Sequence, residues 1–236
     1  MRRMEARLRA RAAARFRLQM RTVTLPWTGL NYRIALPASF DPLLDAAADD
    51  PEQHLPYWAT LWPSGIALGD VILSRRVPLA GISVVELGCG AGVTATAALA
   101  AGARLLATDY ASESLLLCRL NTLANAGCTP RTLRLNWRQP SGTLFHFANP
   151  PFPIILAADV LYETRDVAPL LDLLARLLAP TGTLWLAEPG RPTARLFMAE
   201  ALAAGWQDDV VEHPGPWPDP EDEGVVVRVH RLRQPG

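Results

Sequence analysis

The sequence predicts an α/β fold, a doubly wound and mostly parallel sheet of seven strands with the last strand antiparallel, preceded by an N-terminal helix and hairpin. Two observations lead to this fold class. From Ile82 onward, short apolar runs alternate with longer segments of helical periodicity, as in a series of β-α units. The apolar runs are nearly continuous, which is typical of parallel strands buried on both faces. Half of the residues are apolar and 19% are charged, which excludes a disordered or fibrous chain.

The first part of the chain, residues 1–53, is expected to form an extension to one domain over residues 54–236. All 23 basic residues are arginine, and positions 1–21 hold eight of them against Glu5 alone. The remaining 15 arginines face 22 acidic residues, so the rest of the chain is mildly acidic and is not expected to offer a phosphate-binding surface. Apolar residues at steps of four predict a basic helix over 4–20, expected to be a solvated or frayed arm.

The expected elements follow in order along the chain. A hairpin is expected from strands 22–25 and 32–36, then a loop or short helix over 37–56, then a helix capped by Ser64 and running to about Arg75. The expected strands of the main sheet are 82–87, 103–108, 132–136, 154–158, 183–187, a weaker one near 206–212, and 225–230. The expected helices between them are 92–101, 112–126, 166–179 and 193–204.

The first strand of this series ends in a glycine-rich turn with Glu86, Gly88, Cys89, Gly90 and Gly92. Glycines let the backbone approach a ligand closely and let the N-terminus of the next helix face it. A dinucleotide fingerprint would place its third small residue at 93, where a valine stands, so the spacing is the G-x-G-x-G variant associated with S-adenosylmethionine enzymes. The carboxylate of Glu86 suits a ligand with an ammonium and a sulfonium group and would repel phosphate.

Polar and aromatic residues follow the next two strands. Asp109 comes 21 residues after Gly88 and is expected to accept both ribose hydroxyls, the alternative being a cap on the next helix. Asn136 and Trp137 follow the third strand and are expected to flank an adenine ring, although Trp137 could equally be a core residue.

The fourth strand runs through Ala158 into Asp159, Val160, Leu161 and Tyr162. An unpaired carboxylate is costly at the end of so apolar a run, so a polar partner is expected to meet Asp159; the alternative is a helix cap. Upstream, residues 56–65 concentrate three aromatic side chains, a pattern that by itself most often indicates hydrophobic packing.

Together these segments resemble the seven-β-strand protein lysine methyltransferases of the methyltransferase-like group, and among them the electron transfer flavoprotein β-subunit lysine methyltransferases and their bacterial relatives. The resemblance covers about residues 54–205. The matching pieces are residues 56–65, the glycine loop, Asp109, Asn121 and Asn125, Asn136 and Trp137, 159–162, and Glu188 to Arg191. Glu188 stands where that branch has aspartate, and the N-terminal extension has no counterpart in the family.

The resemblance implies a Rossmann-like methyltransferase sheet that binds S-adenosyl-L-methionine and releases S-adenosyl-L-homocysteine. It implies one group of residues that binds the cofactor and a second group that faces the substrate. Those expected at the cofactor are Trp62, Glu86, Gly88, Cys89, Gly90, Gly92, Asp109, Asn136, Trp137 and Ala158. Asp159 and Tyr162 are expected to be catalytic and to face the substrate amine.

The expected activity is methyl transfer to a lysine of a partner protein, such as the electron transfer flavoprotein β subunit. Since the chain contains no lysine, any lysine substrate is another molecule. A small-molecule or a nucleic-acid methyltransferase on the same fold remains the alternative. Residues 149–152 spell the N-P-P-F motif of enzymes that methylate adenine or glutamine amides, but they precede the expected fourth strand instead of following it, which indicates a chance match.

The remaining features favour a monomeric protein of the bacterial cytoplasm with no metal site. The three cysteines (Cys89, Cys118, Cys128) lack a Cys-x-x-Cys spacing, and the four histidines (His54, His146, His213, His230) are scattered. No apolar run reaches the roughly 18 residues of a membrane span, and no apolar segment follows the basic start as in a secretory signal.

Overall fold

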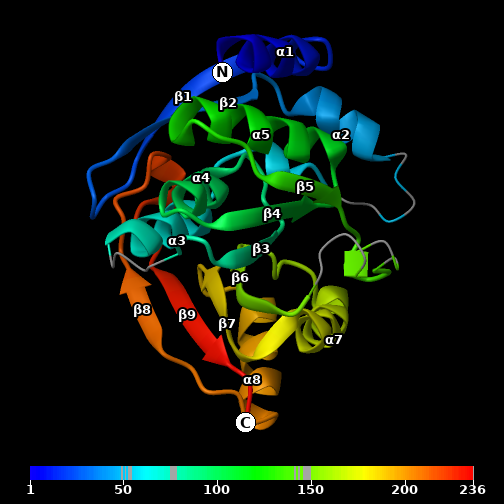
Figure 1. Cartoon of the computed structure of the whole chain (residues 1–236), viewed down its shortest axis with the longest axis vertical. Helices are drawn as coiled ribbons and strands as arrows, with labels where there is room; N and C mark the ends of the chain where they lie inside the picture. Colours follow the sequence, from blue (N-terminus) through cyan, green and yellow to red (C-terminus); the bar gives the residue numbers. More distant parts are fainter. Residues whose placement is uncertain are drawn as a thin grey trace.

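The structure is a computed structural model that describes residues 1–48, 50, 52, 55–74, 79–140, 142, 144–145 and 150–235. Figure 1 shows its central sheet with helices on both sides and the N-terminal helix at one end of the molecule. His54, His146, Arg75 and Asn149, which entered the sequence-based expectations, lie outside the described residues. No helix among the described residues is long and apolar enough to span a membrane.

The main sheet has seven strands, and it confirms the predicted fold class. In spatial order they are β5 (Arg131–Arg134), β4 (Arg104–Asp109), β3 (Ser83–Leu87), β6 (Phe152–Ala158), β7 (Leu178–Glu188), β9 (Val227–Arg233) and β8 (Val210–His213). The first five are parallel, and β9 runs antiparallel to both of its neighbours. The strand order reverses between β3 and β6, which is where ligands bind in open α/β sheets, beyond the carboxyl ends of the strands.

Two apolar cores sandwich this sheet because successive side chains of a strand point to opposite faces. Val84 packs in one core with α3 (Pro63–Ser74), α4 (Val93–Ala100) and α5 (Ser112–Ala126). Its neighbour Val85 packs in the other core with α7 (Val167–Leu177) and α8 (Pro192–Ala203). Each buried strand therefore needs apolar residues at every position, as the continuous runs in the sequence predict.

Three expected boundaries need correction. The helix expected over 166–179 ends at Leu177, and strand β7 begins at once with Leu178, so that the expected helix stop at Pro180 lies inside β7 beside a register shift. Ser64 does not cap α3: the helix begins one residue earlier, and the buried Ser64 hydroxyl has no hydrogen-bond partner among the described residues. Strand β6 begins at Phe152, so Phe152 of the N-P-P-F motif opens the strand at the end opposite to Asp159, in agreement with a chance match.

The basic N-terminal helix differs most from its expectation. It is α1 (Arg2–Ala13), and the residues expected to be its last turn belong instead to β1 (Leu18–Thr24). It is no solvated arm, because Leu8 and Ala12 are buried against leucines of α5. Apolar contact at i and i+4 therefore docks the helix on the main domain.

The hairpin formed by β1 and β2 (Asn31–Pro37) confirms the expected pair and is fixed to α5 by two amides. The Asn121 amide accepts from Ala35 N–H (2.8 Å) and donates to Ala35 C=O (3.0 Å), and Asn125 makes the same pair of bonds with Arg33. These side chains replace a neighbouring strand along the edge of β2. Helix α2 (Asp41–Ala48) lies within the segment 37–56 that was expected to be loop or short helix, and the short 3-10 helix η1 (Tyr57–Ala59) follows that segment.

A buried carboxylate ties the tip of the hairpin to the main domain. Asp70 of α3 is fully buried and accepts hydrogen bonds from Trp27 N–H (2.6 Å) and Thr28 N–H (3.1 Å). The His213 ring nitrogen lies 3.0 Å from the same carboxylate, and the Trp27 indole stacks on that ring at 4.0 Å. His213 thus has a structural position at the end of β8 and is not among the described residues that line the cavity.

Candidate active site

A cavity of about 800 Å³ opens beyond the carboxyl ends of β3, β4 and β6, at the switch point of the sheet. Its volume lies within the range of about 300–1,000 Å³ that is usual for ligand pockets. The structure brings all of the residues expected from the sequence to its wall: Trp62, Glu86, Gly88, Cys89, Gly90, Gly92, Asp109, Asn136, Trp137, Ala158, Asp159 and Tyr162. Residues of α2, η1 and the 15–17 connection complete the wall, and no sequence pattern indicated them.

The glycine loop joins β3 to α4 in a conformation that needs glycine. Gly88 (φ +69°) and Gly92 (φ +83°) have left-handed backbones. A Cβ on Gly88 would come within 2.9 Å of the Val160 side chain, and one on Gly92 within 2.9 Å of the Cys118 Cα. The loop therefore packs tightly from behind while its backbone and the N-terminus of α4 face the cavity.

Asp109 ends β4 and is already held by the glycine loop. Its Oδ2 accepts from Gly90 N–H (2.9 Å), and its Oδ1 accepts from Ala111 N–H (3.0 Å). Burial raises the pKa of Asp109, and these hydrogen bonds oppose the rise. These hydrogen bonds hold the glycine loop, and Asp109 does not cap the first turn of α5. Each carboxylate oxygen of Asp109 keeps a lone pair for a further donor, such as a ribose hydroxyl.

Glu86 is a buried carboxylate at the same wall with an oxygen that lacks a partner. It is 2% exposed, and its Oε2 has no hydrogen-bond partner among the described residues. Burial, and next the negative charge of Asp109, raise the pKa of Glu86 well above its usual range. Such a group calls for a cationic or hydrogen-bond-donating ligand group, because an uncompensated buried charge is costly. Together with the glycine loop and Asp109, this oxygen fits a cofactor with an ammonium group and a ribose.

The other residues expected at the cofactor have mixed surroundings. The Trp137 ring lies 3.8 Å from the Cβ position of Gly88, lines the cavity and also packs on the apolar core. Its contact with an adenine ring stays a prediction. The Asn136 amide is engaged elsewhere, donating to Glu52 (2.9 Å) and accepting from Arg138 N–H (3.0 Å). Burial raises the pKa of the Cys89 thiol, which keeps it protonated and argues against a nucleophile.

Asp159 meets its polar partner in Arg191. Its two oxygens accept a bidentate pair of hydrogen bonds from Arg191, at 2.6 and 3.0 Å. Asp159 has a positive φ of 52° and donates its N–H to Ala187 C=O, so the strand end is held in a strained conformation that aims the carboxylate at the cavity. The 3-10 helix η2 (Thr164–Asp166) has Glu163 as its N-cap, so Asp159 is no helix cap.

Three aromatic rings surround this ion pair. The rings of Tyr57 and Tyr162 meet edge to face at 4.8 Å, and the Tyr57 and Trp62 rings at 6.0 Å. The Arg191 guanidinium lies 5.6 Å from the Trp62 ring, within the range of a cation–π contact. Burial, with the nearby negative charges, raises the pKa of Tyr162, so its hydroxyl stays protonated at neutral pH. Tyr57 and Arg191 belong to segments that resemble the family, residues 56–65 and Glu188 to Arg191. No sequence pattern predicted that they would lie beside Asp159.

Arg191 is held in place by the turn after β7. Glu188 accepts from Gly190 N–H (2.5 Å) and lies 3.5 Å from the His230 ring and 3.7 Å from Arg228. Burial opposes its ionisation, but the hydrogen bonds from His230 and Gly190 outweigh burial and lower the pKa of Glu188. The residue that departs from the family's aspartate therefore fixes the turn that presents Arg191.

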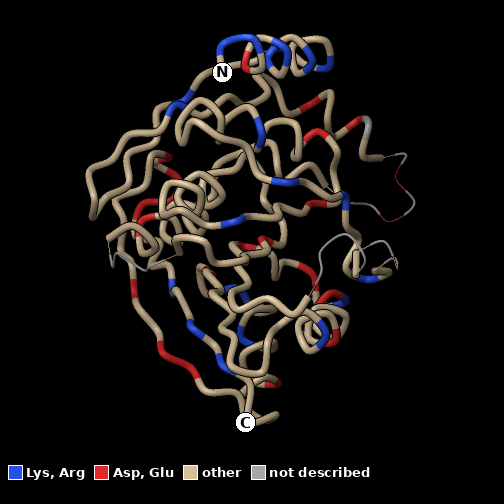
Figure 2. Tube along the Cα trace, viewed as in Figure 1, with Lys and Arg blue, Asp and Glu red and all other residues tan. Residues whose placement is uncertain are grey.

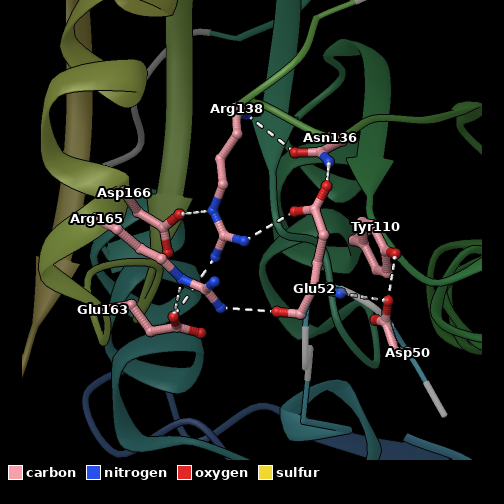
Figure 3. A network of polar contacts seen from close by, with 8 residues as sticks. All are labelled: Asp50, Glu52, Tyr110, Asn136, Arg138, Glu163, Arg165 and Asp166. Atoms are coloured by element: carbon pink, nitrogen blue, oxygen red, sulfur yellow. Dashed lines mark hydrogen bonds and ion pairs between the residues drawn. The ribbon is translucent and has the colours of Figure 1, made fainter.

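A polar network closes one side of the cavity and escaped sequence reasoning (Figure 3). Arg138 donates to Glu52 (2.8 Å) and to Asp166 (2.5 Å), and Arg165 donates to the Glu52 backbone (2.7 Å) and pairs with Glu163. Glu52 thus joins the segment before η1 to the loops that follow β5 and β6. These partners are far apart in sequence, so no spacing could reveal them.

The family comparison agrees with this geometry. Residues 85–184, which hold the glycine loop, Asp109 and Asp159, match the model of a methyltransferase domain family. The strand order and the cavity at its switch point agree with this similarity to a methyltransferase domain of the S-adenosylmethionine-dependent class I type.

Individual relatives point to several kinds of acceptor. The chain is 35% identical over 144 residues to the electron transfer flavoprotein beta subunit lysine methyltransferase of Mus musculus, covering 58% of this chain and 52% of that protein. It is 31% identical over 128 residues to the ubiquinone biosynthesis O-methyltransferase of Xylella fastidiosa (strain 9a5c), covering 54% and 50%. It is 28% identical over 179 residues to EEF1A lysine methyltransferase 3 of Mus musculus, covering 74% and 72%. The chain thus spans about half the length of the first two.

Solved structures share the fold. The N-methyltransferase NodS from Bradyrhizobium japonicum WM9, in complex with S-adenosyl-L-homocysteine, aligns with a TM-score of 0.57 at 20% identity, covering 84% of this chain and 98% of that one. The magnesium protoporphyrin IX methyltransferase from Synechocystis PCC 6803 with bound S-adenosylmethionine gives 0.53 at 14% identity, covering 82% and 96%.

Proposed function

We propose that the protein is an S-adenosylmethionine-dependent N-methyltransferase whose acceptor is a lysine side chain of a partner protein. The observation that carries this proposal is one cavity whose wall holds two groups of residues. The glycine loop, Glu86 and Asp109 come from β3 and β4 and are called the cofactor end, and Asp159 with the aromatic rings beside it follows β6 and is called the acceptor end. The monomeric state, the bacterial cytoplasm as its location and the boundary between residues 53 and 54 remain predictions.

The cofactor end would hold the donor through groups of complementary charge. Asp109 accepts the ribose hydroxyls, Glu86 faces the ammonium, the glycine loop supplies backbone contacts, and Trp137 lies against the adenine. When bound, S-adenosylmethionine supplies a methyl group on a positively charged sulfur, ready for displacement by a nucleophile. Glu86 also repels phosphate, which disfavours nucleotide cofactors at this wall.

The acceptor end suits an amine that arrives charged and reacts neutral. The reference pKa of lysine is about 10.4, and the rings of Tyr57, Trp62 and Tyr162 exclude water, which favours the uncharged amine. Asp159 orients the entering ammonium. The ammonium can bind beside Arg191, because the bidentate bonds from Arg191 leave a free lone pair on each carboxylate oxygen, or it can displace Arg191. The amine loses its proton to water. The pocket holds the amine nitrogen in line with the methyl group and the sulfur, and such alignment lowers an activation barrier by about 7–11 kcal/mol in favourable cases.

A small-molecule acceptor is the second candidate, because of the similarity to the ubiquinone biosynthesis O-methyltransferase. A phenol acceptor would need a general base, whereas Asp159 is paired with Arg191 and the Tyr162 hydroxyl stays protonated. A nucleic-acid acceptor has less support, because Phe152 of the N-P-P-F motif is buried at the far end of β6 from the cavity.

The deciding experiment incubates the protein with radiolabelled S-adenosylmethionine and lysate of the organism that encodes it, followed by gel separation. We expect one labelled band, modified at lysine, and the same reaction with purified electron transfer flavoprotein tests its β subunit directly. Asp159→Asn should abolish the label, whereas Asp172→Asn, at an exposed position of α7, should keep it. Label only in the metabolite fraction would support the small-molecule candidate instead.

A further inference from the structure

The outer face of α1 concentrates positive charge on a folded element. Its arginines are all exposed, while Leu8 and Ala12 on the opposite side of the helix are buried on α5. The residues that form this arginine face are Arg2, Arg3, Arg7, Arg9 and Arg11. The helix spans about 18 Å at 1.5 Å per residue, so the charges lie close together.

Most of this charge has no ion-pair partner among the residues that the structure describes. Glu5 is the acidic residue of α1, and it lies 3.9 Å from Arg9. Arg2, Arg3, Arg7 and Arg11 form no ion pair with any residue that the structure describes. Arginines at i and i+4, such as Arg7 and Arg11, repel each other and destabilise a helix. A counter-charge from outside the chain would remove that repulsion.

The arginine face adjoins the rim of the cavity. The chain leaves α1 through residues 15–17, which line the cavity, and Arg15 pairs with Glu113 at the start of α5 (3.0 Å). On the same rim, α2 presents the exposed carboxylates of Asp41 and Asp45. In the view of Figure 2 the blue positions of α1 and the red positions of α2 appear toward the same end of the molecule. The cavity wall near α1 is basic, with Arg15 and Arg17 among its lining residues, and α2 adds exposed acidic groups beside it.

This charge pattern selects among possible partners. A nucleic-acid backbone that crosses α2 would meet the exposed Asp41 and Asp45 and be repelled, and the chain outside residues 1–21 is acidic. An anionic membrane is disfavoured because the apolar stripe of α1 is already buried on α5 and cannot insert into lipid. A protein surface fits both sides of the rim if acidic residues flank a protruding lysine.

We propose that the arginine face of α1 docks an acidic patch of the protein acceptor, while the carboxylates of α2 lie beside the approaching lysine. This inference rests on the proposed function and adds the recognition surface outside the cavity. The charge of α1 acts on association and leaves the reacting groups unchanged, so its effect belongs in KM and not in kcat.

The test compares two sets of substitutions at Arg2, Arg3, Arg7 and Arg11, all to glutamine or all to lysine. The lysine set keeps the charge and is the matched control, and both sets keep good helix formers. The binding probes are a fluorescein-labelled peptide of ten glutamates and a labelled ten-nucleotide oligouridylate, followed by anisotropy at low and physiological salt. The melting temperature and the binding of S-adenosyl-L-homocysteine check that fold and cavity are intact.

We expect the glutamate peptide to bind the native protein and the lysine set, and to bind the glutamine set about tenfold or more weakly at low salt. If a lysine acceptor is found, its KM should rise by a similar factor in the glutamine set at unchanged kcat. Equal peptide binding by both sets would overturn the proposal, as would tighter binding of the oligouridylate. If no protein in the lysate is methylated, the proposed function is contradicted. The peptide measurement does not depend on that result and still decides whether the arginine face is a docking surface.

Discussion

At the scale of single residues, the unpartnered carboxylate of Glu86 predicts a pH-dependent cofactor affinity. Burial raises the pKa of Glu86, so the free protein holds a proton there that a cationic ligand must displace. Affinity for S-adenosyl-L-homocysteine should therefore rise with pH across the range in which this carboxyl ionises, which lies above that of an ordinary glutamate, by at most about tenfold per pH unit, and then level off. Calorimetry in buffers of different ionisation enthalpy should detect the released proton.

Glu86→Gln is the comparison for that measurement. The amide keeps the shape of the side chain but has no titratable proton, so the variant should bind more weakly and release less proton. Equal proton release by the two proteins would assign the titration to another group.

Asp159 predicts a separation between binding and transfer. Asp159→Ala should abolish methyl transfer and leave the affinity for S-adenosyl-L-homocysteine nearly unchanged, because its carboxylate lies at the acceptor end and bonds to Arg191. Radiolabel transfer and calorimetry on the same preparation make the measurement. Parallel loss of both activities would remove Asp159 from the acceptor end.

The sequence predicted the residues of the site better than their partners. The glycine spacing, Asp109 and Asp159 follow strand ends, and parallel strands bring their carboxyl ends to one edge. Arg191 and Glu52 come from a turn after β7 and from the segment before η1, and they bond to the cavity-lining residues Asp159 and Asn136. These bonds depend on backbone directions that no periodicity encodes.

At the scale of elements, the glycine loop predicts a contrast between two left-handed glycines. Gly92→Ala puts a Cβ 2.9 Å from the Cys118 Cα, whereas Gly127→Ala, at a similar φ after α5, meets nothing within 4 Å. Both variants bear the left-handed strain of about 1–3 kcal/mol. Chemical denaturation should show the larger loss for Gly92→Ala, and cofactor binding should weaken in that variant alone. Equal losses would mean that the loop can shift away from α5.

The attachment of the hairpin predicts a large effect of one buried carboxylate. Asp70→Ala leaves two backbone N–H groups and His213 without their acceptor, which should cost about 3–5 kcal/mol of unfolding free energy. Asp172→Ala on the exposed face of α7 is the control and should change stability by no more than about 0.5 kcal/mol. A loss for Asp70→Ala as small as the control's would show that the hairpin tip is not fixed through this group.

Element types were predictable because each buried strand is continuously apolar and each helix shows its own stripe. The exceptions lie where tertiary contact decides. The helix α1 was predicted as a helix but as a solvated arm, and its docking was missed because the leucines of α5 supply the surface on which it packs. The helix before β7 ends early because Leu178 pairs with Phe152 of β6.

At the scale of the whole molecule, charge and apolar surface are separated. The domain from α3 to β9 carries both cores and most of the cavity wall, and the N-terminal helix carries a cluster of arginines at one end of the molecule (Figure 2). The strand order of the sheet places the cavity at its switch point, so the fold fixes where a ligand binds. The charges around the rim then bear on which acceptor reaches it.

The most direct test of the central claim is titration calorimetry with S-adenosyl-L-methionine and S-adenosyl-L-homocysteine. The account predicts one site for either compound, strongly weakened in Asp109→Asn and kept in Asp172→Asn. Absence of heat with both compounds, together with binding of a nicotinamide dinucleotide or a nucleotide phosphate, would contradict it.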